Sequence, residues 1–456
     1  MLTLAEQSGA LLPARWQMTI SLGSHIVLAC FGVAFPAVIW VVHRRGIRDN
    51  DPVALGLAER WSKVAAVLFA VGAVSGTILS FEMGLLWPEM MRTYGAVIGL
   101  PFALEGIAFF VEAIFIGIYL YGWRRLPPRA HLATLIPIAV SGMVGTFCIL
   151  AVNAWMNGPT GFRVVDGQVV DIEPWAAMFN PRVWLQFAHM WVATFMVVGF
   201  CTAAVYATGM LRGRDDRHHR LGFAVPFAFA TVAAVAQPFV GHLLGARLAA
   251  DQPAKLAAIE LSPHAEDHAP LAVGGIYLDD ERRFALEIPE LGSLISRGAP
   301  GRVVPGLDEF APDDRPDDGL VTAVHWSFQL MVGLGLALMA LGLAHWRSVR
   351  RGHDWLRNRW FLRAAVAAGV ASVASLELGW ITTELGRQPW IVYGHMRVAD
   401  AVTHSGGVWI TLVALCAIYL AMGVGAVVVL RSMARRWRDG EPIDLPTPYG
   451  PGSDLR

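Results

Sequence analysis

Long apolar runs separated by polar connections dominate the chain. A helix needs about 20 apolar residues to cross a hydrocarbon core of about 30 Å. Runs of this length in lipid must be helical, because each segment has to satisfy its own backbone hydrogen bonds. The pattern therefore predicts an all-α integral membrane protein with nine transmembrane helices, at residues 18–42, 62–86, 99–121, 132–153, 183–211, 221–246, 321–346, 361–385 and 404–430.

The connections alternate in charge. Those after the first, third, fifth and seventh runs are rich in arginine, as in HRRGIRDN and GWRRLPPRAH, and the segment after the ninth run begins RSMARRWR. The short connections between them contain few basic residues. Basic connections stay on the cytoplasmic side of a membrane. We therefore expect an extracytoplasmic N-terminus and a cytoplasmic C-terminus, which agrees with an odd number of helices.

One outer connection, residues 247–320, is unusually long and holds 7 basic and 15 acidic residues. Loops of this length are usually functional or disordered. The expected organisation is helices 1–6 in residues 1–246, an extracytoplasmic loop at 247–320, helices 7–9 in 321–430 and a cytoplasmic tail at 431–456.

Composition supports a membrane protein and excludes other classes. Only 16% of the residues are charged, against about a quarter in soluble proteins. The 36 basic residues equal the 36 acidic ones, and no basic patch with interleaved aromatics suggests nucleic-acid binding. The four cysteines show no paired spacing, so neither a zinc site nor a disulfide framework is expected.

Ionisable residues inside the apolar runs are costly, and each is a functional hypothesis. The clearest are His25, Glu105, Glu112, His189, His325, Glu377 and Glu384. At 1.5 Å per residue, His25 lies roughly 10 Å below the outer surface. Glu105 and His189 lie at a similar depth, Met331 lies slightly deeper, and Glu384 is at the outer end of its run. These positions predict a functional layer in the outer half of the membrane.

Histidine and methionine at one level suit haem iron, for which they are common protein ligands. Each could equally be a hydrogen-bonding or packing residue between helices. Glu105 and Glu112 are seven residues apart, so they differ by about 20° around a helix and share one face. Two such acids suggest stations of a proton path, although hydrogen bonding between helices is the alternative.

Several strings together identify a family. The chain resembles subunit I of the cytochrome bd quinol oxidases over essentially its whole length. The strings that carry the resemblance are ARWQM before His25, PFALEGIAFFVEA, ILAVNAWMNGP, NPRVWLQFAH ending in His189, QPAKLAAIE at 252–260, FQLMVGLG around Met331, and ELGWITTELGRQPW at 377–390.

The resemblance implies three haems in the outer half of the bundle. His189 and Met331 match the axial ligands of a low-spin haem b. His25 matches a ligand of the oxygen-reducing pair, to haem d or a further haem b. Glu384 matches the carboxylate at the high-spin haem b, and Arg387 would neutralise haem propionates or that carboxylate.

Other roles follow from the same resemblance. Trp380 matches an aromatic residue between haems, and Glu105 and Glu112 match acids that carry protons to the oxygen site. Lys255 and Glu260 match residues that contact the quinol in the long outer loop. Five residues place them about 140° apart on a helix, so they would hold a headgroup from two sides only if the backbone bends between them.

The resemblance also implies an activity. The chain would be the haem-bearing catalytic subunit of a terminal oxidase in a bacterial cytoplasmic (inner) membrane. It would oxidise ubiquinol or menaquinol at the outer face and reduce oxygen to water with cytoplasmic protons, generating a gradient without pumping. A second multi-span subunit, and possibly a small single-span one, would accompany it.

Three departures from the family pattern leave alternatives open. Gln329 stands where an arginine is expected, Glu105 and Glu112 are separated by seven residues where eight are usual, and Glu82 occupies an amide position. The outer loop is of the short type. A bd-like haem protein with an altered donor or haem content is therefore one alternative. A proton-coupled transporter is another, and it predicts no haem.

Overall fold

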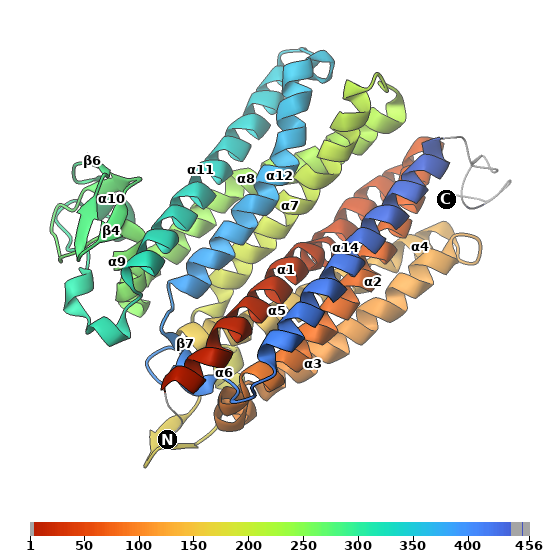
Figure 1. The fold of residues 1–456 in the computed structure, drawn as a ribbon. Helices are drawn as coiled ribbons and strands as arrows, with labels where there is room; N and C mark the ends of the chain where they lie inside the picture. The colour runs from red at the N-terminus through yellow and green to blue at the C-terminus, as the bar shows by residue number, and fades with distance from the viewer. Residues whose placement is uncertain (1–3, 439–448, 450–456) are drawn as a thin grey trace.

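The computed structural model describes residues 4–438 and Tyr449, with side chains from Gly9 onward, and is all-α in its membrane part as predicted (Figure 1). Within these residues, nine helical segments are long and apolar enough to cross a membrane. They are α1 (Leu4–Arg48), α2 (Pro52–Leu86), α3 (Pro88–Gly122), α4 with α5 (Pro128–Ala133 and Leu135–Asn157), α7 (Val183–Leu211), α8 (Arg217–Asp251), α11 (Asp318–Arg350), α12 (Arg359–Leu385) and α14 (Val408–Arg438). Their number and order are those predicted.

The long helices form two packed groups (Figure 1). Helices α7, α8, α11 and α12 lie together, and α1, α2, α3, α5 and α14 form the second group, with α1 and α5 packed against α7. Phe35 and Trp61 belong to the core of the second group, whereas Phe200 and Phe227 belong to the core of the first. Large apolar side chains also remain on the outer faces, as expected for surfaces that meet lipid or another subunit.

Polar caps extend several helices beyond the predicted apolar runs. The Asp51 side chain accepts hydrogen bonds from the first backbone N–H groups of α2, and Asp216, Asp317 and Asn358 do the same for α8, α11 and α12. These side chains satisfy backbone donors that have no partner within the helix. The helices consequently begin before the apolar runs do.

Several boundaries differ clearly from the prediction, and the first two helices already begin at Leu4 and Pro52 rather than at 18 and 62. The run predicted from residue 99 belongs to a helix that begins at Pro88, whose first turns carry the exposed ion pair between Glu89 and Arg92. The ninth helix begins at Val408 rather than at 404, because residues 402–407 form a turn. Most of the predicted tail, 439–448 and 450–456, lies outside the described residues.

The long outer connection is folded. Because α8 runs to Asp251 and α11 begins at Asp318, the segment between them comprises residues 252–317, called the outer segment below. It contains α9 (Pro253–Glu260), β3 (Leu271–Val273), β4 (Ile276–Leu278), β5 (Glu281–Arg283), β6 (Leu286–Ile288), α10 (Leu291–Arg297) and the 3₁₀ turns η1 (Leu307–Glu309) and η2 (Pro312–Asp314). Antiparallel pairs join β3 to β6 and β4 to β5.

Three side chains of α11 hold the outer segment. Both ring nitrogens of His325 face carbonyl oxygens, that of Ile259 at 2.7 Å and that of Gly274 at 3.0 Å. Trp326 donates its indole N–H to Gly275 O, and Gln329 accepts from Gly274 N at 2.8 Å while donating to a second carbonyl, that of β3. His325 is therefore a structural residue, since neither nitrogen is left for a ligand.

Shorter elements connect the remaining helices. They are β1 (Arg163–Val165), β2 (Gln168–Val170) and α6 (Pro174–Met178) before α7, η3 (Trp355–Arg357) before α12, and β7 (Trp390–Val392), β8 (Met396–Arg397) and α13 (Val398–Ala401) before α14. Antiparallel pairs join β1 to β2 and β7 to β8.

Candidate functional site

A continuous polar network joins three helices at the end of the bundle that carries the outer segment. Arg387 donates to Glu384 Oε2 at 2.5 Å, and Asn153 donates to Glu384 Oε1 at 2.8 Å. Asn157 donates to the side-chain oxygen of Asn153 at 3.2 Å, and Lys255 Nζ donates to Asn157 Oδ1 at 2.9 Å. The network thus links the carboxylate expected at a haem to the lysine expected at the quinol, through α12, α5 and α9.

Local sequence explains how these side chains meet. Asn153 and Asn157 are four residues apart in α5, so they lie one turn apart on the same face. Gly386 follows the last turn of α12, where a Cβ would lie 2.8 Å from Lys255 Cγ, so only glycine lets α9 approach this closely. Gln252 donates to both oxygens of Asn157, which fixes the start of α9 on the same residue.

Arg387 has capacity for another partner. Its side chain is only 4% exposed, and its Nε and Nη1 atoms have no hydrogen-bond acceptor among the described residues. A buried guanidinium with two unused donors is costly unless an acceptor is supplied. A carboxylate such as a haem propionate is an acceptor of this kind, because arginine binds carboxylates strongly through paired N–H groups.

Lys255 and Glu260 lie on α9 and are both buried. Burial, together with the neighbouring Arg387 and against the opposing effect of Glu384, lowers the pKa of Lys255 to about 7. Burial raises the pKa of Glu260 to about 7, opposed by Arg282. Residues 253–260 form one uninterrupted helix. The backbone bend that a two-sided hold on one headgroup requires is absent, and the two side chains meet different neighbours.

His189 and Met331 lie in α7 and α11, each beside a glycine of a neighbouring helix. The His189 ring packs against α8, where a Cβ on Gly241 would lie 3.3 Å from its Cε1, and its Nε2 is 3.1 Å from the Gln237 amide. Its Nδ1 has no partner among the described residues. The Met331 sulfur points to α12, 2.8 Å from where a Cβ on Gly379 would lie.

His25 is oriented by a serine of α2. Ser75 donates its hydroxyl hydrogen to Gly72 O at 2.9 Å, so it must accept from His25 Nδ1, which lies at 2.8 Å. This bond fixes the proton on Nδ1 and leaves the Nε2 lone pair for another partner. Such an outer hydrogen bond is typical of metal-ligating histidines.

Glu377 and Trp380 of α12 both lie beside a glycine of α1. A Cβ on Gly23 of α1 would lie 3.3 Å from Glu377 Oε2 and 3.9 Å from the Trp380 ring. Glu377 Oε1 has no hydrogen-bond partner among the described residues. This acid is therefore a further candidate, beside the face of α1 that carries Gly23.

Glu105 and Glu112 both lie in α3. A Cβ on Gly145 of α5 would lie 3.9 Å from Glu105 Cγ, and one on Gly32 of α1 would lie 3.2 Å from Glu112 Oε1. Glu112 lines a small cavity of about 30 Å³ together with Tyr119, toward the basic end of the bundle. A cavity of this size holds about two water molecules.

Sequence reasoning missed the partners of the predicted residues. Asn153, Asn157 and Gln252 belong to strings that carried the resemblance, and the four-residue spacing of the two asparagines was an available signal. Ser75 and Gln237 gave no such signal, because a single polar residue in an apolar run is common.

A second polar cluster at the opposite end was also missed. There Tyr449 bonds to both His43 and His131, and Tyr119 bonds to His43.

The donor set suits haem rather than a bare metal ion. Within the described part of the chain, no group of three or more His, Cys, Asp or Glu side chains is arranged around a common point. The free lone pair of His25 and the unused donors of Arg387 fit a group that supplies its own ring ligands and carboxylates.

Comparisons with known proteins agree with this arrangement. The model of a family described as cytochrome bd terminal oxidase subunit I matches residues 13–437. A putative cytochrome bd menaquinol oxidase subunit I of Bacillus subtilis (strain 168) is 32% identical over 439 residues, which cover 94% of this chain and 97% of that protein. The cytochrome bd-II ubiquinol oxidase subunit 1 of Escherichia coli (strain K12) is 25% identical over 505 residues, covering 95% and 98%.

A solved structure matches over almost the same extent. The bd oxidase from Geobacillus thermodenitrificans has a TM-score of 0.88 and 37% identity, and the match covers 94% of this chain and 98% of that one. The fold and the buried ligand-type residues define a multi-pass, haem-binding membrane protein. The chain belongs to the cytochrome bd terminal oxidase subunit I family.

Proposed function

We propose that the chain is the haem-bearing catalytic subunit of a membrane quinol:oxygen oxidoreductase that takes electrons from quinol at the end of the bundle carrying the outer segment. The observation that carries this proposal is the network from Lys255 through Asn157 and Asn153 to Glu384 and Arg387. It connects a buried lysine on the outer segment with a carboxylate and a guanidinium suited to a haem.

Haem groups, when bound, would supply the electron carriers and the iron at which oxygen is reduced. His189 and Met331 would hold a low-spin haem b, Glu384 a high-spin haem b, and His25 a haem d or a further haem b. The buried Arg387 would bind a propionate with the donors that have no protein acceptor. Trp380 would lie between haem sites, beside Gly23 of α1.

Quinol oxidation requires groups that orient the headgroup and accept its protons. Lys255 and Glu260 would take these roles, and both have a pKa of about 7. Groups with a pKa near the working pH are suited to proton transfer. Because α9 directs the two side chains differently, Lys255 would contact the headgroup on the haem side and Glu260 would pass its proton toward the outer segment.

Protons for oxygen reduction would come from the basic end of the bundle. Glu112 and Glu105 would be the last stations, in that order, and the cavity shared by Glu112 and Tyr119 would hold the water that reaches them. A partner subunit would supply the remainder of the path.

The basic connections indicate the membrane orientation, and the exposed apolar faces indicate partner subunits. The basic connections would face the cytoplasm of a bacterium, with the outer segment outside and the N-terminus beside it. A second multi-span subunit, and possibly a small single-span one, would cover the apolar faces. Ubiquinol and menaquinol are both named among the relatives, so the donor is proposed as a membrane quinol.

One observation favours a modified version of this function. Gln329 stands where the family pattern has an arginine, and both of its side-chain polar atoms bind the backbone of the outer segment. It would therefore give no charge to a haem propionate. A low-spin haem that lacks this charge would have a lower potential, which suits a donor of lower potential.

Purified oxidase complex tests the proposal. We expect a pyridine haemochrome with three haems per complex, and oxygen consumption with a quinol analogue. Lys255→Ala or Glu260→Ala should lower the quinol-dependent rate at least tenfold, while an artificial donor that reduces the haems directly still supports oxygen consumption. Equal loss with both donors would contradict a quinol site on α9.

A further inference from the structure

A basic cavity lies at the opposite end of the bundle, far from every residue assigned above. It has a volume of about 530 Å³ and is formed by the starts of α2 and α8, the turn before α8 and the end of α14. Small-molecule sites in proteins usually have volumes of about 300–1,000 Å³. Its size is therefore that of a ligand site.

Three arginines line this cavity. Arg60 projects from α2, Arg214 from the turn before α8 and Arg438 from the end of α14. Arg214 and Arg438 form no ion pair with any described residue, while Arg60 approaches His218 Nε2 at 3.5 Å and lies 5.6 Å from the centre of the Trp437 ring. The cavity thus concentrates positive charge that the surrounding side chains do not neutralise.

One acidic residue, Asp216, also lines the cavity, but both of its oxygens are engaged. Oδ1 accepts from the backbone N–H of His219 at 3.0 Å, and Oδ2 accepts from the ring Nδ1 of the same residue at 2.8 Å. Asp51, at the start of α2, is likewise engaged by two backbone N–H groups and by Arg217 at 2.5 Å. Neither acid forms an ion pair with Arg60, Arg214 or Arg438.

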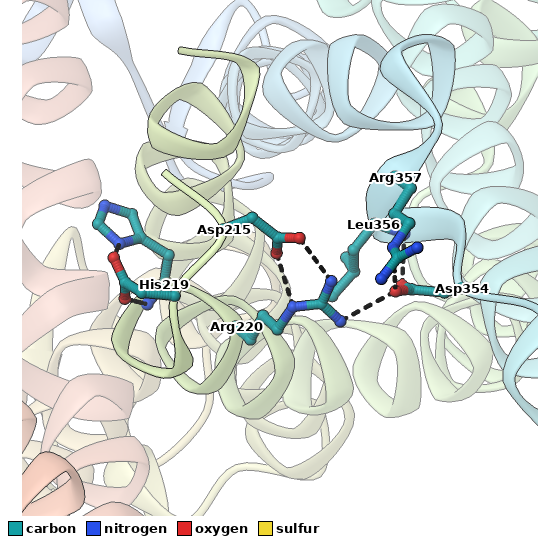
Figure 2. Close-up of polar contacts among 7 residues, drawn as sticks. Asp215, His219, Arg220, Asp354, Leu356 and Arg357 are labelled. Atoms are coloured by element: carbon teal, nitrogen blue, oxygen red, sulfur yellow. Dashed lines mark hydrogen bonds and ion pairs between the residues drawn. The ribbon is translucent and has the colours of Figure 1, made fainter. Parts of the chain in front are cut away.

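Ion pairs lie close to the turn before α8, as Figure 2 shows. Arg220 donates to both oxygens of Asp215, at 2.6 and 2.7 Å, and to Asp354 at 3.0 Å. Asp354 also pairs with Arg357 at 3.4 Å. These contacts tie the turn before α8 to the connection before α12, so the turn that carries Arg214 is held on both sides.

The level of the cavity identifies the source of the ligand. Val427, Val428 and Val429 of α14 are exposed apolar residues of a membrane-spanning helix. Trp437 lies eight residues further on, or about 12 Å along the helix. Tryptophan is enriched where a helix leaves the hydrocarbon for the headgroup region. The cavity therefore lies at the depth of lipid phosphates.

We propose that this cavity binds the phosphate of an anionic phospholipid, with Arg60, Arg214 and Arg438 as the charged ligands. Basic pockets between membrane helices on the cytoplasmic side are suited to such headgroups. The guanidinium groups donate several N–H groups to phosphate oxygens, and the acyl chains continue along the apolar face of α14. The site shares no residue with the proposed quinol and haem sites. The lipid proposal therefore does not depend on those assignments.

The test uses the whole purified oxidase in detergent, titrated with phosphatidylglycerol, cardiolipin or phosphatidylcholine and monitored by thermal unfolding and native mass spectrometry. A basic residue near an anionic lipid surface contributes about fivefold in affinity. The double variant Arg214→Gln with Arg438→Gln should bind phosphatidylglycerol and cardiolipin roughly 25-fold more weakly. Arg214→Lys with Arg438→Lys should retain most of the binding, which separates charge loss from misfolding.

Arg359→Gln is the matched control, because Arg359 is an exposed arginine at the same end that does not line the cavity. It should bind anionic lipid as the wild type does. Equal binding of phosphatidylcholine, or unchanged lipid affinity in the double glutamine variant, would overturn the proposal. Stabilisation by inorganic phosphate or ATP without any effect of lipid would assign the arginines to a soluble ligand and overturn the lipid source.

The chain's own acidic tail is the remaining competitor for the arginines. Asp439, Glu441 and Asp444 follow Arg438 in the sequence. Anionic lipid that binds only after these three acids are replaced by their amides would assign the cavity to the tail and overturn the proposal.

Discussion

Two asparagine side chains link Lys255 to Glu384 by hydrogen bonds across the candidate site. Asn157 receives a hydrogen bond from Lys255 and donates to Asn153, which in turn donates to Glu384. An asparagine side chain has both an acceptor and donors, so it can join a buried lysine to a carboxylate without adding charge. This explains why neutral residues stand between two charged positions of the network.

Replacement of Asn157 by alanine should therefore weaken quinol oxidation. It leaves the buried Lys255 without its side-chain acceptor, which costs about 1–3 kcal/mol. We expect quinol kcat/KM to fall about tenfold or more, measured by oxygen consumption. Asn358→Ala is the control, because it removes only the cap of α12 at the opposite end. It should lower Tm, with a loss of about 1 kcal/mol, and leave kcat/KM unchanged.

The pH dependence of quinol oxidation should follow Glu260 and Lys255. Because the pKa of Glu260 is raised to about 7, this carboxyl binds a proton as the pH falls through 7 and can no longer accept one. The pKa of Lys255 is lowered to about 7, so its charge is lost as the pH rises through the same value. We therefore expect a narrow bell-shaped profile of kcat/KM centred near pH 7.

Substitutions separate the two limbs of this profile. Glu260→Gln should abolish the fall on the acid side at a lower absolute rate, and Lys255→Arg should abolish the fall on the alkaline side. Profiles recorded with an artificial donor provide the baseline. If Glu260→Gln keeps the acid limb, the titrating group lies elsewhere.

At the scale of elements, α11 is both a membrane helix and the anchor of the outer segment. Gln329 and His325 bind backbone atoms of residues 259–274. We predict that Gln329→Ala increases the rate of proteolytic cleavage within residues 252–317 severalfold in the purified complex. Leu330→Ala, at an exposed apolar position one residue away, is the control. Identical cleavage rates in the two variants would refute the anchoring role.

The nine helices could be predicted from sequence because each apolar run is long enough to cross the membrane. Their ends could not, because polar caps such as Asp51 and Asn358 start helices outside the apolar pattern. The pairs β3–β6 and β4–β5 have strands of three residues, too short for a periodic signal.

Candidate ligands such as His189 could be found from sequence, because an ionisable residue within a transmembrane run is energetically unfavourable and rare. Partners such as Gln252 were not, because they arise from how the outer segment folds back on α5.

At the scale of the whole molecule, equal numbers of basic and acidic residues conceal a separation. The outer segment is acidic, whereas the basic connections lie at the other end, where the arginine-lined cavity is found. This separation orients a protein in the membrane. In the proposed function, quinol oxidation and proton uptake would lie on opposite sides, so that the reaction itself would transfer charge.

Cysteine labelling tests this orientation in intact cells. Phe284 in the outer segment is 88% exposed, and His353 is exposed in the connection between α11 and α12. A membrane-impermeant thiol reagent should label Phe284→Cys in whole cells and label His353→Cys only after the membrane is opened. The unsubstituted chain, with its four free cysteines, gives the background. The reverse pattern would invert the proposed topology.

The most direct test of the account is the reduced-minus-oxidised visible spectrum of the purified complex carrying His189→Ala or Met331→Leu. His345→Gln serves as the control, because His345 is a membrane histidine stacked on Phe361 and has no ligand role here. The account predicts that both ligand variants assemble but lose the low-spin haem b signal, while the control keeps it. An unchanged spectrum in His189→Ala and Met331→Leu would contradict the assignment of the haem ligands.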